Sequence, residues 1–149
     1  MKKIISKNPL FFAFVTPAVT DTIVTLLGQD PAYWINHRVI NEASPVYFFL
    51  LASPFVYIIG SLIWYIFWYW TFKHLKEPLN LAITLLFLIG HSWGSSSWIH
   101  KFLLDKRIYN LFSQNSTMFG WGLIILYFVA ISSIATYCLR IYINQRRNG

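Results

Sequence analysis

The chain has 149 residues, of which 56% are hydrophobic, 19% are aromatic and only 11% are charged. Soluble domains usually carry about a quarter charged residues, so this composition excludes that class and indicates one small domain embedded in lipid. The net charge of +7 does not indicate a nucleic-acid partner, because the Lys and Arg residues lie at the ends of apolar runs. Cys138 is the only cysteine, which excludes an internal disulfide and a cysteine metal cluster.

Four apolar stretches are long enough to cross the roughly 30 Å hydrocarbon core of a bilayer. They cover about residues 9–27, 45–72, 81–99 and 118–139. The second stretch is long and uncharged, so we expect tilt or a kink near Pro54. The third is the least apolar, because residues 90–97 are mostly Gly, Ser and His. Lipid would not accept that surface, so this half must face other helices.

The predicted fold class is all-α, an integral membrane bundle of four transmembrane helices in a single domain over residues 1–149. The loops at 28–44 and 100–116 are long for simple hairpins. Both mix apolar and charged residues, so we expect one or two short interfacial helices on the outer face, one at 32–40 and one within 100–116.

The distribution of positive charge predicts the orientation of the chain, since cytoplasmic segments are enriched in Lys and Arg. The N-terminus, the 73–80 loop and the C-terminal tail hold eight of these residues: Lys2, Lys3, Lys7, Lys73, Lys76, Arg140, Arg146 and Arg147. The two other loops hold four: Arg38, Lys101, Lys106 and Arg107. We therefore expect both termini in the cytoplasm, with a bacterial plasma membrane as the default location.

Two ionisable residues fall inside the predicted spans, where their cost in lipid marks a ligand, a pathway or a buried partner. Asp21 lies roughly 9 Å below the outer end of the first span, at 1.5 Å per residue. His91 lies at a similar depth in the third span, so a buried contact between the two is expected. Each has small polar company at helical spacing, Thr25 beside Asp21 and Ser95 beside His91.

Two more candidate groups enter from the same side of the membrane. Glu42 precedes the second span and His100 ends the third. Convergence of Asp21, Glu42, His91 and His100 would suit a divalent metal such as zinc or iron with one position open to water. The same four groups would also suit a proton relay or general acid–base chemistry. A third interpretation is structural, in which Asp21 and His91 only hydrogen-bond between packed helices.

The segment Asp21-Thr22-Ile23-Val24-Thr25 with Gly28, followed by Asn41-Glu42-Ala43-Ser44-Pro45, resembles a family of small uncharacterised bacterial four-helix membrane proteins. In that family the first helix carries an Asp and a Thr, and a Glu-x-x-Pro turn precedes the second helix. The resemblance covers the first third of the chain. It implies that Asp21 and Glu42 belong to one site, and it implies no reaction.

Three functional hypotheses follow from these residues. The leading one is a small polytopic membrane protein with an outward-facing polar site that holds a cation or a small polar ligand, with Asp21 and His91 at its floor and Glu42 and His100 at its rim. The second is a non-catalytic accessory subunit that packs against other membrane subunits. The third is a metal-dependent membrane hydrolase that uses the same four residues.

Overall fold

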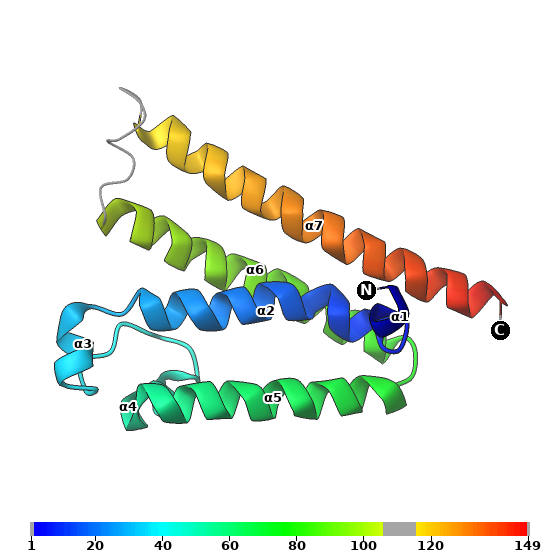
Figure 1. Cartoon of the computed structure of the whole chain (residues 1–149), viewed down its shortest axis with the longest axis horizontal. Coiled ribbons are helices and arrows are strands. Elements are labelled where there is room, and N and C mark those ends of the chain that lie inside the picture. Colours follow the sequence, from blue (N-terminus) through cyan, green and yellow to red (C-terminus); the bar gives the residue numbers. More distant parts are fainter. Residues whose placement is uncertain (1, 106–115, 149) are drawn as a thin grey trace.

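The computed structural model describes residues 2–105 and 116–148, and helices make up most of that part of the chain. Four of the helices in this part are much longer than the others (Figure 1). The elements in order are α1 (Lys2–Ile5), α2 (Pro9–Leu27), α3 (Pro31–Ile35), α4 (Tyr47–Ala52), α5 (Pro54–His74), α6 (Leu79–Asp105) and α7 (Ser116–Asn148).

The predicted second span, 45–72, is not one helix. Pro54 has no backbone N–H, so it cannot donate to the carbonyl of Leu50 one turn earlier, and the chain divides into α4 and α5 at this point. Ser53 caps α5 by accepting from the N–H of Val56 at 3.0 Å. The freed Leu50 carbonyl accepts instead from the hydroxyl of the fully buried Tyr33, at 3.0 Å. The expected kink at Pro54 is therefore a break, stabilised from α3.

α2 is the central helix of the bundle. It packs against α5, α6 and α7. Its first half carries Leu10, Phe11 and Phe14, which are buried in an aromatic cluster with Phe72 of α5. A second buried cluster at the opposite end joins Tyr33, Leu50 and Tyr57. α2 is thus the element on which any site inside the bundle depends.

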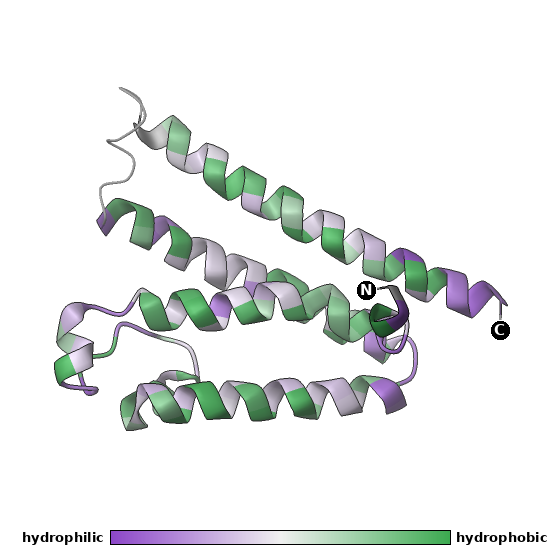
Figure 2. Cartoon of the chain, viewed as in Figure 1, coloured by the Kyte–Doolittle hydropathy of each residue, from purple (hydrophilic) through white to green (hydrophobic). Residues whose placement is uncertain are grey.

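Among the helices that the structure describes, three are long and apolar enough to cross a membrane: α2, α5 and the Met118–Asn148 part of α7. α6 has 27 residues and runs beside α2, but its middle is less apolar than the other three (Figure 2). This matches the expectation that residues 90–97 are too polar to face lipid. Over residues 2–105 and 116–148 the structure is thus all-helical, with three candidate membrane spans.

Both termini and the connection between α5 and α6 lie at one end of the bundle (Figure 1). Several polar contacts hold this end together. Glu77 in the connection forms an ion pair with Arg146 at 2.7 Å and accepts a hydrogen bond from Tyr142. The hydrogen bond from Tyr142 and then the bond from Arg146 hold the pKa of Glu77 below its usual value. Gln145 donates to the carbonyl of Ser6 at 2.8 Å.

The predicted interfacial helices fare differently. α3 is present but ends at Ile35, five residues before the end of the predicted helix at 32–40. Within 100–116, residues 100–105 continue α6 in one helix with the third span, so that part of the prediction is wrong. Residues 106–115 lie outside the part of the chain that the structure describes.

Candidate functional site

The predicted contact between Asp21 and His91 is present. The Nδ1 atom of His91 on α6 lies 2.9 Å from the Oδ2 atom of Asp21 on α2, and the two side chains are 28% and 22% exposed. A carboxylate can only accept a hydrogen bond, so an ionised Asp21 requires the proton on Nδ1. This leaves Nε2 as the atom that can accept a further proton. No described residue hydrogen-bonds to Nε2.

Glycines bring α2 and α6 close enough for this contact. A Cβ atom at Gly94 would lie 2.9 Å from Oδ1 and 3.1 Å from Oδ2 of Asp21. One at Gly28 would lie only 2.4 Å from the ring of Trp98. Small residues allow such close approach between membrane helices, where polar contacts then help hold the pair together. The position of the Asp21 carboxylate is therefore set by the absence of a side chain on the facing helix.

Hydroxyl groups from four helices surround the pair. On α2, Thr25 donates to Oδ1 of Asp21 at 3.5 Å, near the upper limit of a hydrogen bond. The hydroxyls of Thr22 and Tyr65 are 2.5 Å apart, which joins α2 to α5. On the other side, the hydroxyls of Ser95 and Tyr127 are also 2.5 Å apart and join α6 to α7. The site is a layer of polar contacts across four helices.

Aromatic rings hold the imidazole of His91 from the side of the apolar cluster. The ring centroid of Trp64 lies 5.3 Å from that of His91 with the rings nearly perpendicular, and that of Phe87 lies 6.1 Å away. Contact with two rings, one of them edge-to-face, restricts how the imidazole can turn. His91 is thereby oriented by three contacts: the carboxylate of Asp21 at one nitrogen and the two aromatic rings.

A polar stripe on α2 leads from the pair towards the end of the helix that faces α3. Asp21 and Thr25 lie one turn apart on α2, and Gln29 follows at the same interval just beyond the C-cap residue Gly28. The side chain of Gln29 is buried, donates to the carbonyl of Thr25 at 3.0 Å and accepts from the N–H of Asn41 at 3.0 Å. The stripe therefore ends against the loop that precedes Glu42.

The same end of α2 carries a cation. Lys101 of α6 donates to the carbonyl of Gly28 at 2.8 Å and forms an ion pair with Asp30 at 3.1 Å. Its Nζ also lies 3.4 Å from Asp105 and 5.3 Å from the ring centroid of Trp98. A positive charge here interacts favourably with the negative, C-terminal end of the α2 dipole, and it gives the Gly28 carbonyl a hydrogen-bond donor.

The predicted four-residue metal site is not formed. Within the described residues, no three His, Cys, Asp or Glu side chains are close enough together to hold a metal ion. Glu42 instead accepts from the N–H of Ser44 in its own loop at 2.7 Å. His100 packs against Trp121 of α7, with ring centroids 6.2 Å apart. Glu42 and His100 were grouped with the pair because all four residues lie near the same end of the predicted spans. That shared position does not bring their side chains into contact.

Three tyrosines of the site were missed by the sequence analysis. They are Tyr57, Tyr65 and Tyr127, none of which was named as a candidate residue. Tyr57 is buried beside Thr22 and Thr25, and its surroundings include Asp21. One signal was available: Tyr57, Ser61 and Tyr65 form a polar stripe at intervals of four residues on α5.

Comparisons with known proteins give no assignment. No protein-family model, no curated protein and no solved structure matches this chain. The resemblance to the family of small bacterial membrane proteins thus stays a prediction, and the functional argument rests on the site.

Proposed function

We propose that this chain is a four-span integral membrane protein in which the Asp21–His91 pair takes up and releases a proton, in exchange with a small polar ligand or water. The observation that carries the proposal is the 2.9 Å contact between Nδ1 of His91 and Oδ2 of Asp21, with Nε2 left without a partner among the described residues. The sequence led us to expect a site that holds a cation, and in this proposal that cation is a proton. Glu42 and His100 are not part of the proposed site.

The proton-handling role follows from the chemistry of the two groups. A carboxylate that accepts from Nδ1 fixes the tautomer of the imidazole and stabilises the imidazolium that forms when Nε2 takes a proton. Neither group needs a metal for this exchange. Ionisable residues within a span are costly unless they are paired, and such pairs are typical of proton relays.

The placement of the polar groups supports four crossings. The polar half of α6 packs on α2, where His91 and Ser95 meet Asp21 and Tyr127 instead of lipid. With α6 as a fourth span, both termini fall on one side of the membrane. The excess of Lys and Arg at that end favours the cytoplasm, and a bacterial plasma membrane is the default.

Access to the pair is proposed from the outer side only. On the side of the termini, the rings of Phe14, Trp64 and Phe87 pack against one another below His91. On the other side, the stripe of Asp21, Thr25 and Gln29 reaches the outer loop. This arrangement favours a site that exchanges protons with one compartment over a channel that conducts them across.

Infrared difference spectroscopy tests the proposal on the protein in lipid vesicles attached to a reflection crystal. We expect reversible imidazole and carboxylate bands when the buffer pH is stepped between 8 and 5, and loss of the paired bands in both Asp21→Asn and His91→Gln. The matched control is His74→Gln, because His74 lies exposed at the end of α5. Bands that persist in both site variants would contradict the proposal.

The two rival functions stand differently. A metal-dependent hydrolase needs a ligand set, and the described residues do not form one. An accessory subunit would present apolar helix faces to its partners. α5 has many exposed large hydrophobic residues, including Ile63 and Ile66, but lipid would cover the same faces equally well. Of the three hypotheses, proton exchange at the Asp21–His91 pair is the one that explains the layer of polar contacts across the four helices.

A further inference from the structure

Arg140 and Arg147 lie on one exposed face of α7. They are two helical turns apart, so their side chains leave the helix in nearly the same direction, about 10 Å apart along its axis. Both are exposed, and neither forms a hydrogen bond or an ion pair with a described residue. Arg146 differs, because it forms the ion pair with Glu77. The face thus carries two positive charges that the described part of the chain does not neutralise.

Negative charges are scarce at this end of the molecule. Residues 1–20, 73–80 and 116–149 together hold eight Lys and Arg residues and a single acidic residue, Glu77. The carboxylate of Glu77 already accepts from Tyr142 and Arg146. α7 itself contains no Asp or Glu. The positive charge at this end is therefore unbalanced, and it attracts an anionic partner from outside the chain.

The position of Arg140 along α7 indicates where that partner lies. The apolar residues from about 118 to 139 are enough to cross the hydrocarbon core, and Arg140 is the first charged residue after them. Figure 2 shows the same change along α7, which becomes hydrophilic towards its C-terminal end. With α7 as a span, an arginine at this point holds its guanidinium among the lipid headgroups.

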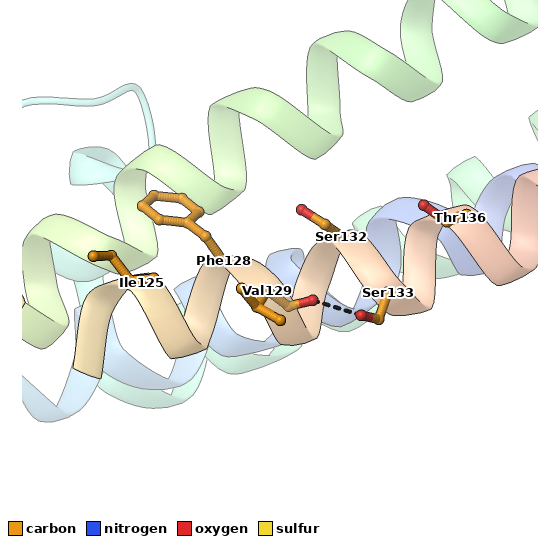
Figure 3. A pocket seen from close by; sticks show the side chains of 6 residues that line it. All are labelled: Ile125, Phe128, Val129, Ser132, Ser133 and Thr136. Atoms are coloured by element: carbon orange, nitrogen blue, oxygen red, sulfur yellow. Dashed lines mark hydrogen bonds between the residues drawn. The ribbon is translucent and has the colours of Figure 1, made fainter. Parts of the chain in front are cut away.

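A shallow hollow continues the same side of α7 into the membrane. Its lining residues all belong to α7: Ile125, Phe128, Val129, Ser132, Ser133 and Thr136 (Figure 3). None of them is charged, and most of the exposed lining is apolar, as an acyl chain requires. Thr136 lies one turn from Arg140, about 6 Å deeper. Its hydroxyl bonds to no described residue and can donate to an ester oxygen of a lipid.

We propose that this face of α7 binds an anionic phospholipid, with the phosphate between Arg140 and Arg147 and an acyl chain in the hollow. A guanidinium suits this partner, because it donates two parallel hydrogen bonds to phosphate oxygens. A zwitterionic headgroup would add a positive charge for which α7 has no carboxylate, so the site prefers a headgroup with net negative charge. The inference needs α7 to cross the membrane and does not depend on proton exchange at Asp21 and His91.

Native mass spectrometry of the detergent-solubilised protein tests the preference, with phosphatidylglycerol and phosphatidylcholine of the same acyl chains as probes. We expect the wild type to bind phosphatidylglycerol at least tenfold more tightly. Arg140→Gln combined with Arg147→Gln should weaken that binding about thirtyfold, since both charges near the headgroup are lost. A wild type without preference would leave the arginines to an acidic protein or a nucleic acid and would overturn the proposal. Unchanged binding in the double variant would do the same.

The matched control is Lys73→Gln combined with Lys76→Gln, which removes the same charge from the same end but not from α7. The Nζ atom of Lys73 already lies 4.4 Å from the ring centroid of Trp70 and 4.6 Å from that of Tyr69. We expect this variant to lose less than threefold in binding. Equal losses in the two double variants would show a general attraction to the positive end and would overturn the site on α7.

A competitor without acyl chains separates a lipid from a free phosphate compound. Glycerol 3-phosphate carries a phosphate but cannot occupy the hollow. At millimolar concentration it should leave bound phosphatidylglycerol in place. Displacement of the lipid would overturn the role assigned to the hollow, because binding would then depend on the phosphate alone.

Discussion

The two halves of α2 have contrasting surroundings. The half from Pro9 to Ala18 packs into apolar rings, with Phe14 fully buried against Phe72 and Phe87. The half from Asp21 onward contacts His91 through Asp21 and the hydroxyl of Tyr65 through Thr22, and it ends beside the buried amide of Gln29. One helix therefore carries a packed aromatic cluster at one end and a polar site at the other.

This difference separates stability from function along one helix. Rings that interlock at van der Waals contact contribute mainly packing energy, and a cavity among them is costly. Polar contacts inside a membrane contribute less, about 0.6 kcal/mol on average, because alternative partners exist in the unfolded state. Substitutions in the first half should change the free energy of unfolding, and those in the second half should change proton exchange.

The largest expected effect on stability comes from Phe14→Ala. Removing a fully buried ring that contacts Phe72 and Phe87 leaves a cavity, which should lower the free energy of unfolding by about 3–5 kcal/mol. The measurement is reversible unfolding in mixed micelles. Ile23→Ala on the same helix is the control, because Ile23 is 51% exposed and should lose well under 1 kcal/mol. Equal losses of unfolding free energy in Phe14→Ala and Ile23→Ala would contradict the assignment of stability to the aromatic half of α2.

Gly94→Ala should have the next largest effect and should also disrupt the site. Its Cβ atom would lie 2.9 Å from the Asp21 carboxylate, so the carboxylate or the helix must move, at a cost of about 1–3 kcal/mol. Gly90→Ala is the control one turn away, where a Cβ atom meets nothing within 4 Å. There the better helix propensity of Ala should stabilise by up to about 1 kcal/mol. Unfolding free energies that change in the same direction in Gly94→Ala and Gly90→Ala would contradict this account.

Asp21→Asn should have a small effect on stability and a large one on proton exchange. Asn keeps the shape of the side chain and can hydrogen-bond to His91 as a donor through its amide group, so the free energy of unfolding should fall by only about 0.6 kcal/mol. The infrared bands of the paired groups should disappear in the same variant. Unfolding in micelles and the infrared spectra are measured on one preparation. A fully folded variant with unchanged bands would show that the pair only joins two helices.

The smallest effect is expected at the end that holds the termini, in Glu77→Gln. The pKa of Glu77 is lowered in the folded protein, so its contribution to stability is present above the ordinary value of about 4.5 and is lost as the pH falls through the lower folded value. The wild type should therefore be slightly more stable than the variant at pH 7 and equal to it at strongly acid pH. The measurement is the free energy of unfolding of both proteins at both pH values. The same difference between wild type and variant at the two pH values would contradict the prediction.

The sequence predicted the parts of this molecule that follow from hydropathy and helical spacing. The helix bounds at 9–27 and the contact of Asp21 with His91 both follow from local patterns, as does the expected kink at Pro54, which the structure shows as a full break between α4 and α5. The grouping of Glu42 and His100 with that pair failed because similar depth does not determine which way a side chain points. Tyr57 and Tyr127 were missed because an aromatic residue in a span gives no sign of whether its hydroxyl is bonded until the facing helix is known.

Nitrogen NMR of His91 in lipid vesicles tests the central claim most directly, with the resonance assigned by its loss in His91→Gln. We predict that the neutral ring carries its proton on Nδ1, held by Asp21, with Nε2 unprotonated, and that Asp21→Asn shifts the ring towards the other tautomer. A His91 ring protonated on Nε2 in the wild type, or a spectrum unchanged by Asp21→Asn, would contradict the account.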